Sequence, residues 1–185
     1  MLDDLSADFR RYKESTRNNT RQNFLNIFYV LSNSPGLLAI LNHRYGFWID
    51  HRFENNHILR YFFKAFYILG TYLTAILLKT QIEIATEIGR GFYVSNKGNC
   101  IIGARKIGER CTISHNVTIG IGLDGVPPEI GDDVLIESQS VIYGNITIGN
   151  NVVIKKGTVL NRDVPSGSIV QGNPAKIISR EKTVQ

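Results

Sequence analysis

The chain has 185 residues, of which 43% are hydrophobic and 20% are charged, and its formal net charge is +5. This apolar fraction is too high for an intrinsically disordered chain, and the small basic excess gives no reason to expect nucleic-acid binding. Two cysteines, Cys100 and Cys111, are too few for a disulfide framework or a four-cysteine zinc site, which favours a reducing, cytoplasmic compartment. The acidic start of the chain does not have the pattern of a signal peptide.

The composition changes near residue 82. Residues 1–81 contain 15 of the 18 aromatic residues, whereas 14 of the 17 glycines follow them. Most of the basic excess also lies in the first part: residues 1–81 contain 10 basic and 6 acidic residues, whereas the remainder contains 11 basic and 10 acidic residues. We therefore predict an α-helical N-terminal domain over 1–81, a second domain over 82–171 and a C-terminal segment over 172–185.

In the first part of the chain, residues 1–81, the apolar residues recur at helical spacing. Residues 1–20 are polar and predict a frayed helix or a tail, and apolar positions in 21–31 predict a helix that ends before Pro35. After His57 a further helix is predicted, with an apolar stripe of Phe62, Phe66, Leu69, Leu73 and Ile76. Its uncharged run is shorter than the ~20 residues that span a bilayer. We expect a helix buried in an oligomer; the alternative is peripheral contact with the inner face of a membrane.

The second part repeats every six residues. The aliphatic positions are Ile82, Ile88, Val94, Ile101, Ile107, Ile113, Ile119, Ile130, Ile136, Ile142, Ile148, Ile154 and Leu160, with one extra residue after Val94 and a longer excursion over 120–129. A second small or β-branched residue, such as Cys111, stands four positions after many of them. Three such hexads close one coil of a parallel β-helix, so we predict about four coils. The alternative, a β-sandwich, would give alternating patterns with variable turns instead.

This repeat, the excursion and the segment Gly172-Asn173-Pro174-Ala175-Lys176 resemble the hexapeptide-repeat acyltransferases with a left-handed β-helix. The serine acetyltransferase branch, with its relatives that modify bacterial polysaccharides, is the most similar. The resemblance implies a mainly β protein, a left-handed parallel β-helix with a helical N-terminal domain, and acetyl transfer from acetyl-CoA (coenzyme A) without a metal. It also implies a homotrimer, or a dimer of trimers. The left hand of the coil comes from the resemblance alone.

Transfer of an acetyl group to a hydroxyl needs a base, and histidine suits this role because its ordinary pKa of about 6.5 lies near working pH. His115 is the single histidine after residue 82, at an outward corner of its hexad, a few residues before the excursion. Three hexads away, the same column carries Asn96 on one side and Ser138, then Lys156, on the other. We predict that His115 is the general base.

The acceptor site is predicted from the resemblance. Serine acetyltransferases carry an Asp-His pair where this chain has Ser95-Asn96, and a His-Pro-Lys-Ile motif where it has Pro127-Pro128-Glu129-Ile130. Both family histidines are therefore missing, and we hypothesise that the base has moved up one coil, to His115. Asn96, Asp124 and Glu129 are the candidate substrate-binding residues, and either acid is a candidate to orient the imidazole.

The resemblance places coenzyme A along a groove between coils. Lys155, Lys156 and Lys176 are candidate partners for its nucleotide phosphate, and Gly144 and Gly157 are candidates for close approach of its pantetheine arm.

As acceptor we expect a sugar hydroxyl of a bacterial capsule, O-antigen or exopolysaccharide; the alternative is serine, for cysteine biosynthesis. A metal-binding coil of the γ-carbonic anhydrase type needs three histidines at an interface, and a purely structural solenoid would not need the excursion, so both are less favoured. We expect no nucleic-acid partner.

Overall fold

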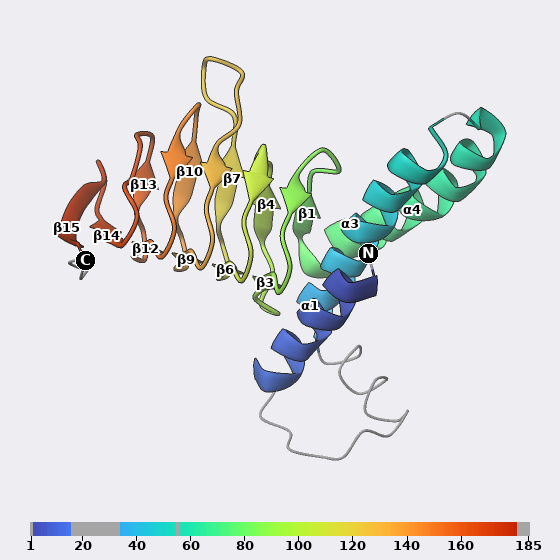
Figure 1. The fold of residues 1–185 in the computed structure, drawn as a ribbon, viewed down its shortest axis with the longest axis horizontal. Coiled ribbons are helices and arrows are strands. Elements are labelled where there is room, and N and C mark those ends of the chain that lie inside the picture. Colours follow the sequence, from blue (N-terminus) through green and yellow to red (C-terminus); the bar gives the residue numbers. More distant parts are fainter. Residues whose placement is uncertain (1, 16–33, 55, 181–185) are drawn as a thin grey trace.

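The computed structural model describes residues 2–15, 34–54 and 56–180, and the helix predicted over 21–31 lies outside them. Among these described residues, three helices precede the coil: α1 (Leu2–Ser15), α3 (Pro35–Arg52) and α4 (His57–Leu78). Helices α3 and α4 pack against each other as a hairpin that projects from the first coil, and α1 lies beside α3 (Figure 1). The stripe predicted after His57 is thus helical.

Residues 80–180 wind into a parallel β-helix with three sheets (Figure 1). Sheet A contains β1 (Thr80–Ile82), β4 (Cys100–Ile102), β7 (Thr118–Gly120), β10 (Val141–Tyr143) and β13 (Val159–Leu160). Sheet B contains β2 (Glu87–Ile88), β5 (Lys106–Ile107), β8 (Glu129–Ile130) and β11 (Thr147–Ile148). Sheet C contains β3 (Tyr93–Val94), β6 (Thr112–Ile113), β9 (Leu135–Ile136), β12 (Val153–Ile154), β14 (Ser168–Gln171) and β15 (Lys176–Arg180), the last of which pairs antiparallel with β14.

The predicted fold class, mainly β with a parallel β-helix and a helical N-terminal region, is confirmed. The coil has about five turns, because sheet A contains five strands among the described residues, where the sequence led us to expect about four. The hexad count stopped at Leu160, whereas β14 continues sheet C beyond that residue.

Stacked aliphatic side chains fill the interior. Ile113 and Ile136, for example, are buried and lie in register on neighbouring strands of sheet C. The expected inward position Ile101 is wrong: its side chain is 55% exposed, whereas Ile102 is 1% exposed and pairs with Ile119. Both residues are isoleucine, so the pattern of residue types could not tell which one faces inward. Cys111 is buried, as expected, and burial raises the pKa of its thiol to about 11.

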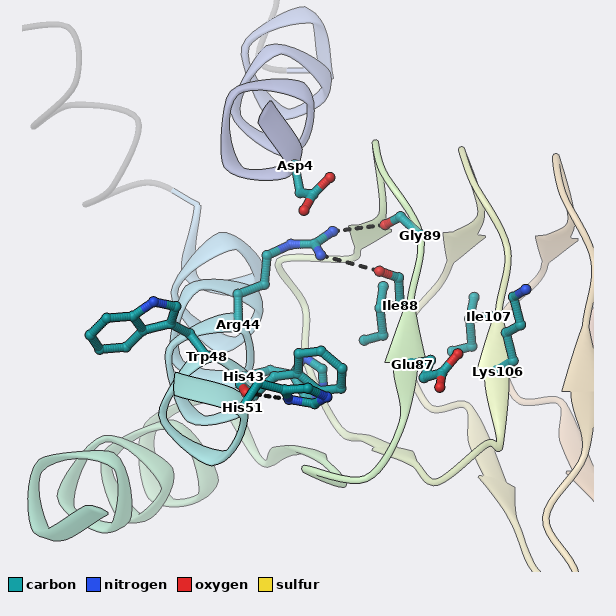
Figure 2. Close-up of a pocket in the computed structure, with 11 residues that line it drawn as sticks. Asp4, His43, Arg44, Trp48, His51, Glu87, Ile88, Gly89, Lys106 and Ile107 are labelled. Carbon is teal, nitrogen blue, oxygen red and sulfur yellow. Dashed lines mark hydrogen bonds between the residues drawn. The ribbon is translucent and has the colours of Figure 1, made fainter. Parts of the chain in front are cut away.

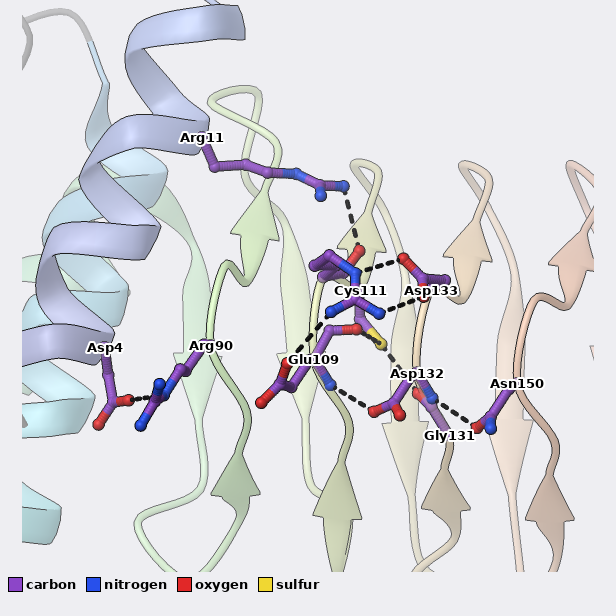
Figure 3. Close-up of polar contacts among 10 residues, drawn as sticks. Asp4, Arg11, Arg90, Glu109, Cys111, Gly131, Asp132, Asp133 and Asn150 are labelled. Atoms are coloured by element: carbon purple, nitrogen blue, oxygen red, sulfur yellow. Dashed lines mark hydrogen bonds and ion pairs between the residues drawn. The ribbon is translucent and has the colours of Figure 1, made fainter.

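The corners of the coil repeat a single backbone conformation. The corner between sheets C and A is here called the C–A corner (residues 95–99, 114–117, 137–140 and 155–158). Each of its coils has a left-handed φ of 56–71°, at Gly98 and Asn99 in the first coil and at Asn116, Gln139 and Gly157 in the following ones. Glycine and asparagine adopt this conformation at low cost, which explains their frequency in the repeat. At the corner between sheets B and C, the side chains of Asp132 and Asn150 accept main-chain N–H groups of the preceding coil at 2.8 Å (Figure 3).

Helix α1 docks onto the first coils, so the expectation of a tail or a frayed helix over 1–20 is wrong for residues 2–15. The hydroxyl of the buried Tyr12 donates to the carbonyl of Val94 at 2.5 Å and accepts its N–H at 2.9 Å. Arg11 reaches the next coil, where it donates to the hydroxyl of Thr112 at 2.7 Å. Figure 3 shows Arg11 extending from α1 toward the coil and the ion pair between Asp4 and Arg90.

A buried ion pair ties α1 to α3. The carboxylate of Asp8 is 2.6 Å from the guanidinium of Arg44 and also accepts the N–H of Phe92 at 2.9 Å. Burial raises the pKa of Asp8, although Arg44 acts in the opposite direction. The helical region and the start of the coil therefore share one set of contacts.

Candidate functional site

His115 lies on the C–A corner between β6 and β7, and its side chain is half-buried. The main chain on both sides is held: the N–H of Ser114 donates to Ile136 at 2.9 Å, and the carbonyl of His115 accepts from Gln139 at 3.2 Å. The left-handed residue Asn116 follows at once, with φ 56°. These main-chain hydrogen bonds therefore fix the position from which the imidazole projects out of the coil.

The column predicted around His115 matches the order of strands in sheet C. Strands β3, β6, β9 and β12 are consecutive neighbours, so the corners that follow them stack in order. Asn96, His115, Ser138 and Lys156 occupy these successive corners. The structure thus brings Asn96 and Lys156 to the same edge of the coil as His115.

Asn96 has a structural partner in the helical region. Its Oδ1 accepts the N–H of Gly36 at 3.2 Å, at the start of α3. Ser34 occupies the N-cap position of this helix but makes no side-chain capping hydrogen bond, and Pro35 has no N–H to offer. Asn96 therefore supplies the cap from the coil, an interaction that does not require it to bind a substrate.

A pocket of about 360 Å³ lies on sheet A beside the C–A corner. Its described lining residues are Ala75, Lys79, Gln81, Asn99, Ile101, Asn116 and Thr118. The Nδ2 of Asn99 donates to Oδ1 of Asn116 at 2.5 Å, which aligns two amides along one wall. Lys79 alone among these residues carries a charge; it caps the C-terminus of α4 with φ 49°.

Sequence reasoning missed this pocket because three separate segments build it. Lys79 directly follows the apolar run of α4, and its position in the sequence indicates only the end of a helix. Asn99 and Asn116 have positive φ, and asparagine at such positions indicates only a turn. The available signal was that Asn116 is adjacent to His115, so one wall of the pocket lies next to the predicted base.

The excursion leaves the coil at a different corner. It connects β7 to β8, at the corner between sheets A and B, here the A–B corner (residues 120–129 and 143–146), and projects outward in Figure 1. Asp124 accepts the N–H of Asn145 at 3.0 Å, and Glu129 forms an ion pair with Arg105 at 2.8 Å. Both acids thus have partners near their own corner. The structure does not bring either of them to His115 within one protomer.

The two glycines predicted to bind the pantetheine arm leave the main chain open to approach. A Cβ added to Gly144 or to Gly157 would meet no heavy atom within 4 Å, and both residues have positive φ, 92° and 71°. Gly120, the strand neighbour of Tyr143, is equally open. These open surfaces fit the close approach of a flexible pantetheine chain. Gly144 and Gly157 belong to different corners, so they do not form one groove within a protomer.

The predicted phosphate-binding lysines differ in their surroundings. Lys155 is 2.9 Å from Glu137, and this hydrogen bond lowers the pKa of the Glu137 carboxyl. Lys156 is exposed, although its N–H donates to the same carboxylate at 3.0 Å. Lys176 is exposed at the start of β15 and lines a cavity of about 320 Å³ at the C-terminal end of the coil. The charge of Lys155 is therefore already partly compensated.

A separate cavity of about 500 Å³ lies between α3 and sheet B (Figure 2). His43, Phe47 and His51 stack along α3 beside it, and Glu87 and Lys106 line the opposite side. None of its described lining residues belongs to the C–A corner. This cavity is therefore distinct from the His115 site.

Among the described residues, no group of three histidine, cysteine or acidic side chains is arranged to hold a metal ion. Within the same residues, no helix is long and apolar enough to cross a bilayer.

Comparison with known proteins identifies relatives of the whole chain. The family model "Bacterial transferase hexapeptide (six repeats)" matches residues 127–162. A serine acetyltransferase of Synechococcus elongatus is 32% identical over 184 residues, which cover 97% of this chain and 70% of the relative. The similarity thus includes the helices as well as the coil.

Solved structures agree with this result. Serine acetyltransferase from Brucella abortus in complex with coenzyme A superposes with a TM-score of 0.76 at 25% identity, covering 97% of this chain and 68% of that one. The Neisseria gonorrhoeae enzyme in complex with serine has a TM-score of 0.73 at 27% identity, covering 95% and 67%.

These findings correct the expected acceptor. The sequence led us to expect a sugar hydroxyl of a surface polysaccharide, because both family histidines are absent, but the relatives are named serine acetyltransferases. The expectation of a saccharide acceptor is therefore wrong. At one of the two positions without a family histidine, Asn96 caps α3, and this structural role says nothing about the acceptor.

Proposed function

Because this chain belongs to the serine acetyltransferase family, we propose that it transfers the acetyl group of acetyl-CoA to the hydroxyl of serine. It is an O-acetyltransferase that uses acetyl-CoA as co-substrate. The observation that carries the choice of serine is the identity of 32% over 97% of this chain, helices included, with a serine acetyltransferase. A hexapeptide coil alone would support only acyl transfer.

His115 acts as the general base in this proposal. The hydroxyl oxygen of serine attacks the thioester carbonyl carbon while the imidazole removes the hydroxyl proton. The tetrahedral intermediate then collapses, the C–S bond breaks, and the imidazolium returns the proton to the departing sulfur. The products are O-acetylserine and coenzyme A. The main-chain hydrogen bonds of Ser114, His115 and Asn116 support this role because they hold the residue in place through its backbone and not through its imidazole ring.

The pocket beside the C–A corner offers complementary partners for a zwitterionic amino acid. Lys79 supplies a positive charge for the carboxylate, and the amides of Asn99 and Asn116 add hydrogen-bonding groups. The last carbonyls of α4, at the negative end of the helix, suit the ammonium group. Its volume of about 360 Å³ is ample for one amino acid.

The bare main chain at Gly144 and Gly157 would accommodate the pantetheine arm, and Lys156 and Lys176 would face its phosphates. Because Gly144 and the excursion lie at the A–B corner, one protomer does not assemble the complete site. We propose that the chain forms a trimer in which the excursion of one protomer closes the C–A corner of the next, with Asp124 and Glu129 in its wall.

The test is an assay of thiol release from acetyl-CoA by the purified full chain. Addition of serine should accelerate release at least tenfold over the rate with acetyl-CoA alone, and mass spectrometry should identify O-acetylserine. Threonine and oligosaccharides serve as comparison acceptors. Equal rates with and without serine would refute the proposal.

A further inference from the structure

The cavity of about 500 Å³ between α3 and sheet B takes no part in the proposed reaction. Its volume lies in the range of small-molecule sites, about 300–1,000 Å³, and such sites are common where two domains meet, as the helical region and the coil do here. Figure 2 shows residues of α3 on one side and residues of β2 and β5 on the other. Regular secondary structure forms both walls, which gives a binding site a fixed shape.

The α3 wall is aromatic. His43, Phe47 and His51 follow one another in steps of four residues, and the ring centroids of Phe47 and His51 are 4.2 Å apart. The half-buried Trp48 lines the same cavity and packs edge to face against Phe53, with 5.4 Å between ring centroids. Rings held in this way offer an apolar surface that suits the aromatic group of a ligand.

Two charged side chains that line the cavity already have partners. Arg44, which forms the ion pair with α1 described above, also donates to the main-chain carbonyls of Ile88 at 3.1 Å and Gly89 at 2.7 Å (Figure 2). Asp4 forms an ion pair in which its carboxylate oxygen lies 2.9 Å from Nε of Arg90. The charges of Arg44 and Asp4 are therefore compensated within the protein.

The sheet B wall offers one free charge of each sign. Glu87 on β2 and Lys106 on β5 are exposed and lie in register on neighbouring parallel strands. Neither side chain forms a hydrogen bond or an ion pair with any other described residue. A carboxylate and an ammonium group side by side are complementary to a ligand that itself carries both charges, because each forms a charge-assisted hydrogen bond with its opposite.

A buried acceptor in the α3 wall lacks a donor. His43 is 3% exposed and lines the cavity. Its Nε2 donates to the carbonyl of Glu83 at 3.1 Å, and burial lowers its pKa to about 4, so the ring is neutral near pH 7 and Nδ1 is an acceptor. Nδ1 has no partner in the part of the chain that the structure describes, which is costly for a buried polar atom. A ligand that brings N–H groups into the cavity is one source of the missing donor.

We propose that this cavity binds a free α-amino acid with an aromatic side chain. Its ammonium group binds Glu87, its carboxylate binds Lys106, and its ring lies against Phe47 and Trp48. A nucleotide fits less well, because Glu87 stands beside Lys106 and repels a phosphate. A hydrocarbon chain would leave both charges without a partner. The site shares none of its described lining residues with the pocket proposed for serine.

The first experiment uses the fluorescence of Trp48, which is the single tryptophan of the chain. Addition of L-phenylalanine to the purified full chain should change this fluorescence along a saturable curve. Phenylpropionate lacks the ammonium group and phenethylamine lacks the carboxylate, so each should bind at least about tenfold more weakly than L-phenylalanine. Equal affinity for either compound, or the absence of a saturable change with L-phenylalanine, would overturn the proposal.

Serine and adenosine monophosphate are tested in the same way. Serine carries both charges without the aromatic ring, so its affinity should be at least about tenfold lower than that of L-phenylalanine. Tighter binding of adenosine monophosphate would identify a nucleotide site, and tighter binding of serine would identify a second acceptor site. Either result would contradict the proposal. The readout does not depend on acetyl transfer, so this proposal and the proposed function fail independently.

The second experiment assigns the two charges. Lys106→Met should weaken binding of L-phenylalanine by about 10–100-fold without weakening that of phenethylamine, which has no carboxylate. Glu87→Gln should weaken binding of L-phenylalanine to a similar extent without weakening that of phenylpropionate, which has no ammonium group. The control is Lys97→Met, at an exposed lysine of the C–A corner, which should bind like the wild type. Equal weakening of all three ligands in both variants, or equal weakening in the control, would show that these side chains do not bind the ligand.

Discussion

The side-chain oxygen of Asn96 lies 3.2 Å from the main-chain nitrogen of Gly36, which precedes it by 60 residues. This contact lets a corner of the coil cap the N-terminus of α3. It is needed because Pro35 has no N–H and Ser34 makes no side-chain cap. An added Cβ on Gly36 would lie 2.2 Å from the carbonyl oxygen of Val94, so the helix start and the coil approach each other closely.

Replacing Asn96 by alanine should destabilise the protein without removing catalysis. Loss of a capping side chain costs about 0.5–2 kcal/mol, typically about 1 kcal/mol. Chemical denaturation should show this decrease in the free energy of unfolding. Serine-dependent thiol release should fall less than threefold. Lys97→Ala, at the exposed neighbouring residue, is the control and should change neither quantity. A loss of activity of a hundredfold with unchanged stability would instead place Asn96 in the reaction.

Replacing His115 by alanine should reduce serine-dependent thiol release by about 10²–10⁴-fold, because general-base catalysis is worth that much. The free energy of unfolding should change little, since the half-buried ring is not part of the interior. The matched control is His51→Ala, which removes an exposed histidine on α3. A decrease of less than threefold in the His115 variant, with the fold intact, would exclude it as the base.

Replacing Lys79 by methionine should weaken binding of the acceptor. A hydrogen bond to a charged group contributes about 1.5–3 kcal/mol, so the KM for serine should rise by about 10–100-fold while kcat changes little. Serinamide, which has no carboxylate, should be a poor acceptor for the wild type. The variant should no longer distinguish it from serine. Lys106→Met, on sheet B, is the control. An unchanged KM in the Lys79 variant would contradict the assignment of this pocket.

Local repetition explains what the sequence predicted well. Each hexad places one aliphatic residue and one turn, so the ladders through Ile113 and Ile136 follow from short-range pattern alone. The inward register at Ile102 did not follow, because an irregular corner precedes it and its neighbour Ile101 is the same residue type. Period counting is reliable only where no residue is inserted.

Long-range contacts explain what the sequence did not predict. Tyr12 binds Val94, and no local pattern in 1–20 indicates a docked helix, since the two residues are 82 positions apart. The role of Asn96 depends in the same way on Gly36. For the candidate site, the sequence predicted which residues share the column of His115. It did not predict that Lys79 lines the pocket beside this column, because the end of α4 meets sheet A only in the folded chain.

Stability should fall as the pH decreases through the range in which His43 titrates. This side chain is buried, and burial, followed by the charge of Arg44, lowers its pKa from 6.5 to about 4. Below pH 6.5 the unfolded state therefore binds a proton that the folded state resists. The contribution of His43 is complete above pH 6.5 and is lost as the pH falls toward 4, by on the order of 3 kcal/mol in all.

Comparison with His43→Gln isolates this effect, because glutamine can still donate to the carbonyl of Glu83, which lies 3.1 Å from Nε2 of His43. The free energy of unfolding, measured by denaturant titration at several pH values, should decline more steeply for the wild type between pH 6.5 and 4. The nearby carboxyl of Asp8, whose pKa burial raises, titrates in both proteins and cancels in the difference. Parallel curves for the two proteins would show that His43 is protonated in the folded state, contrary to its burial.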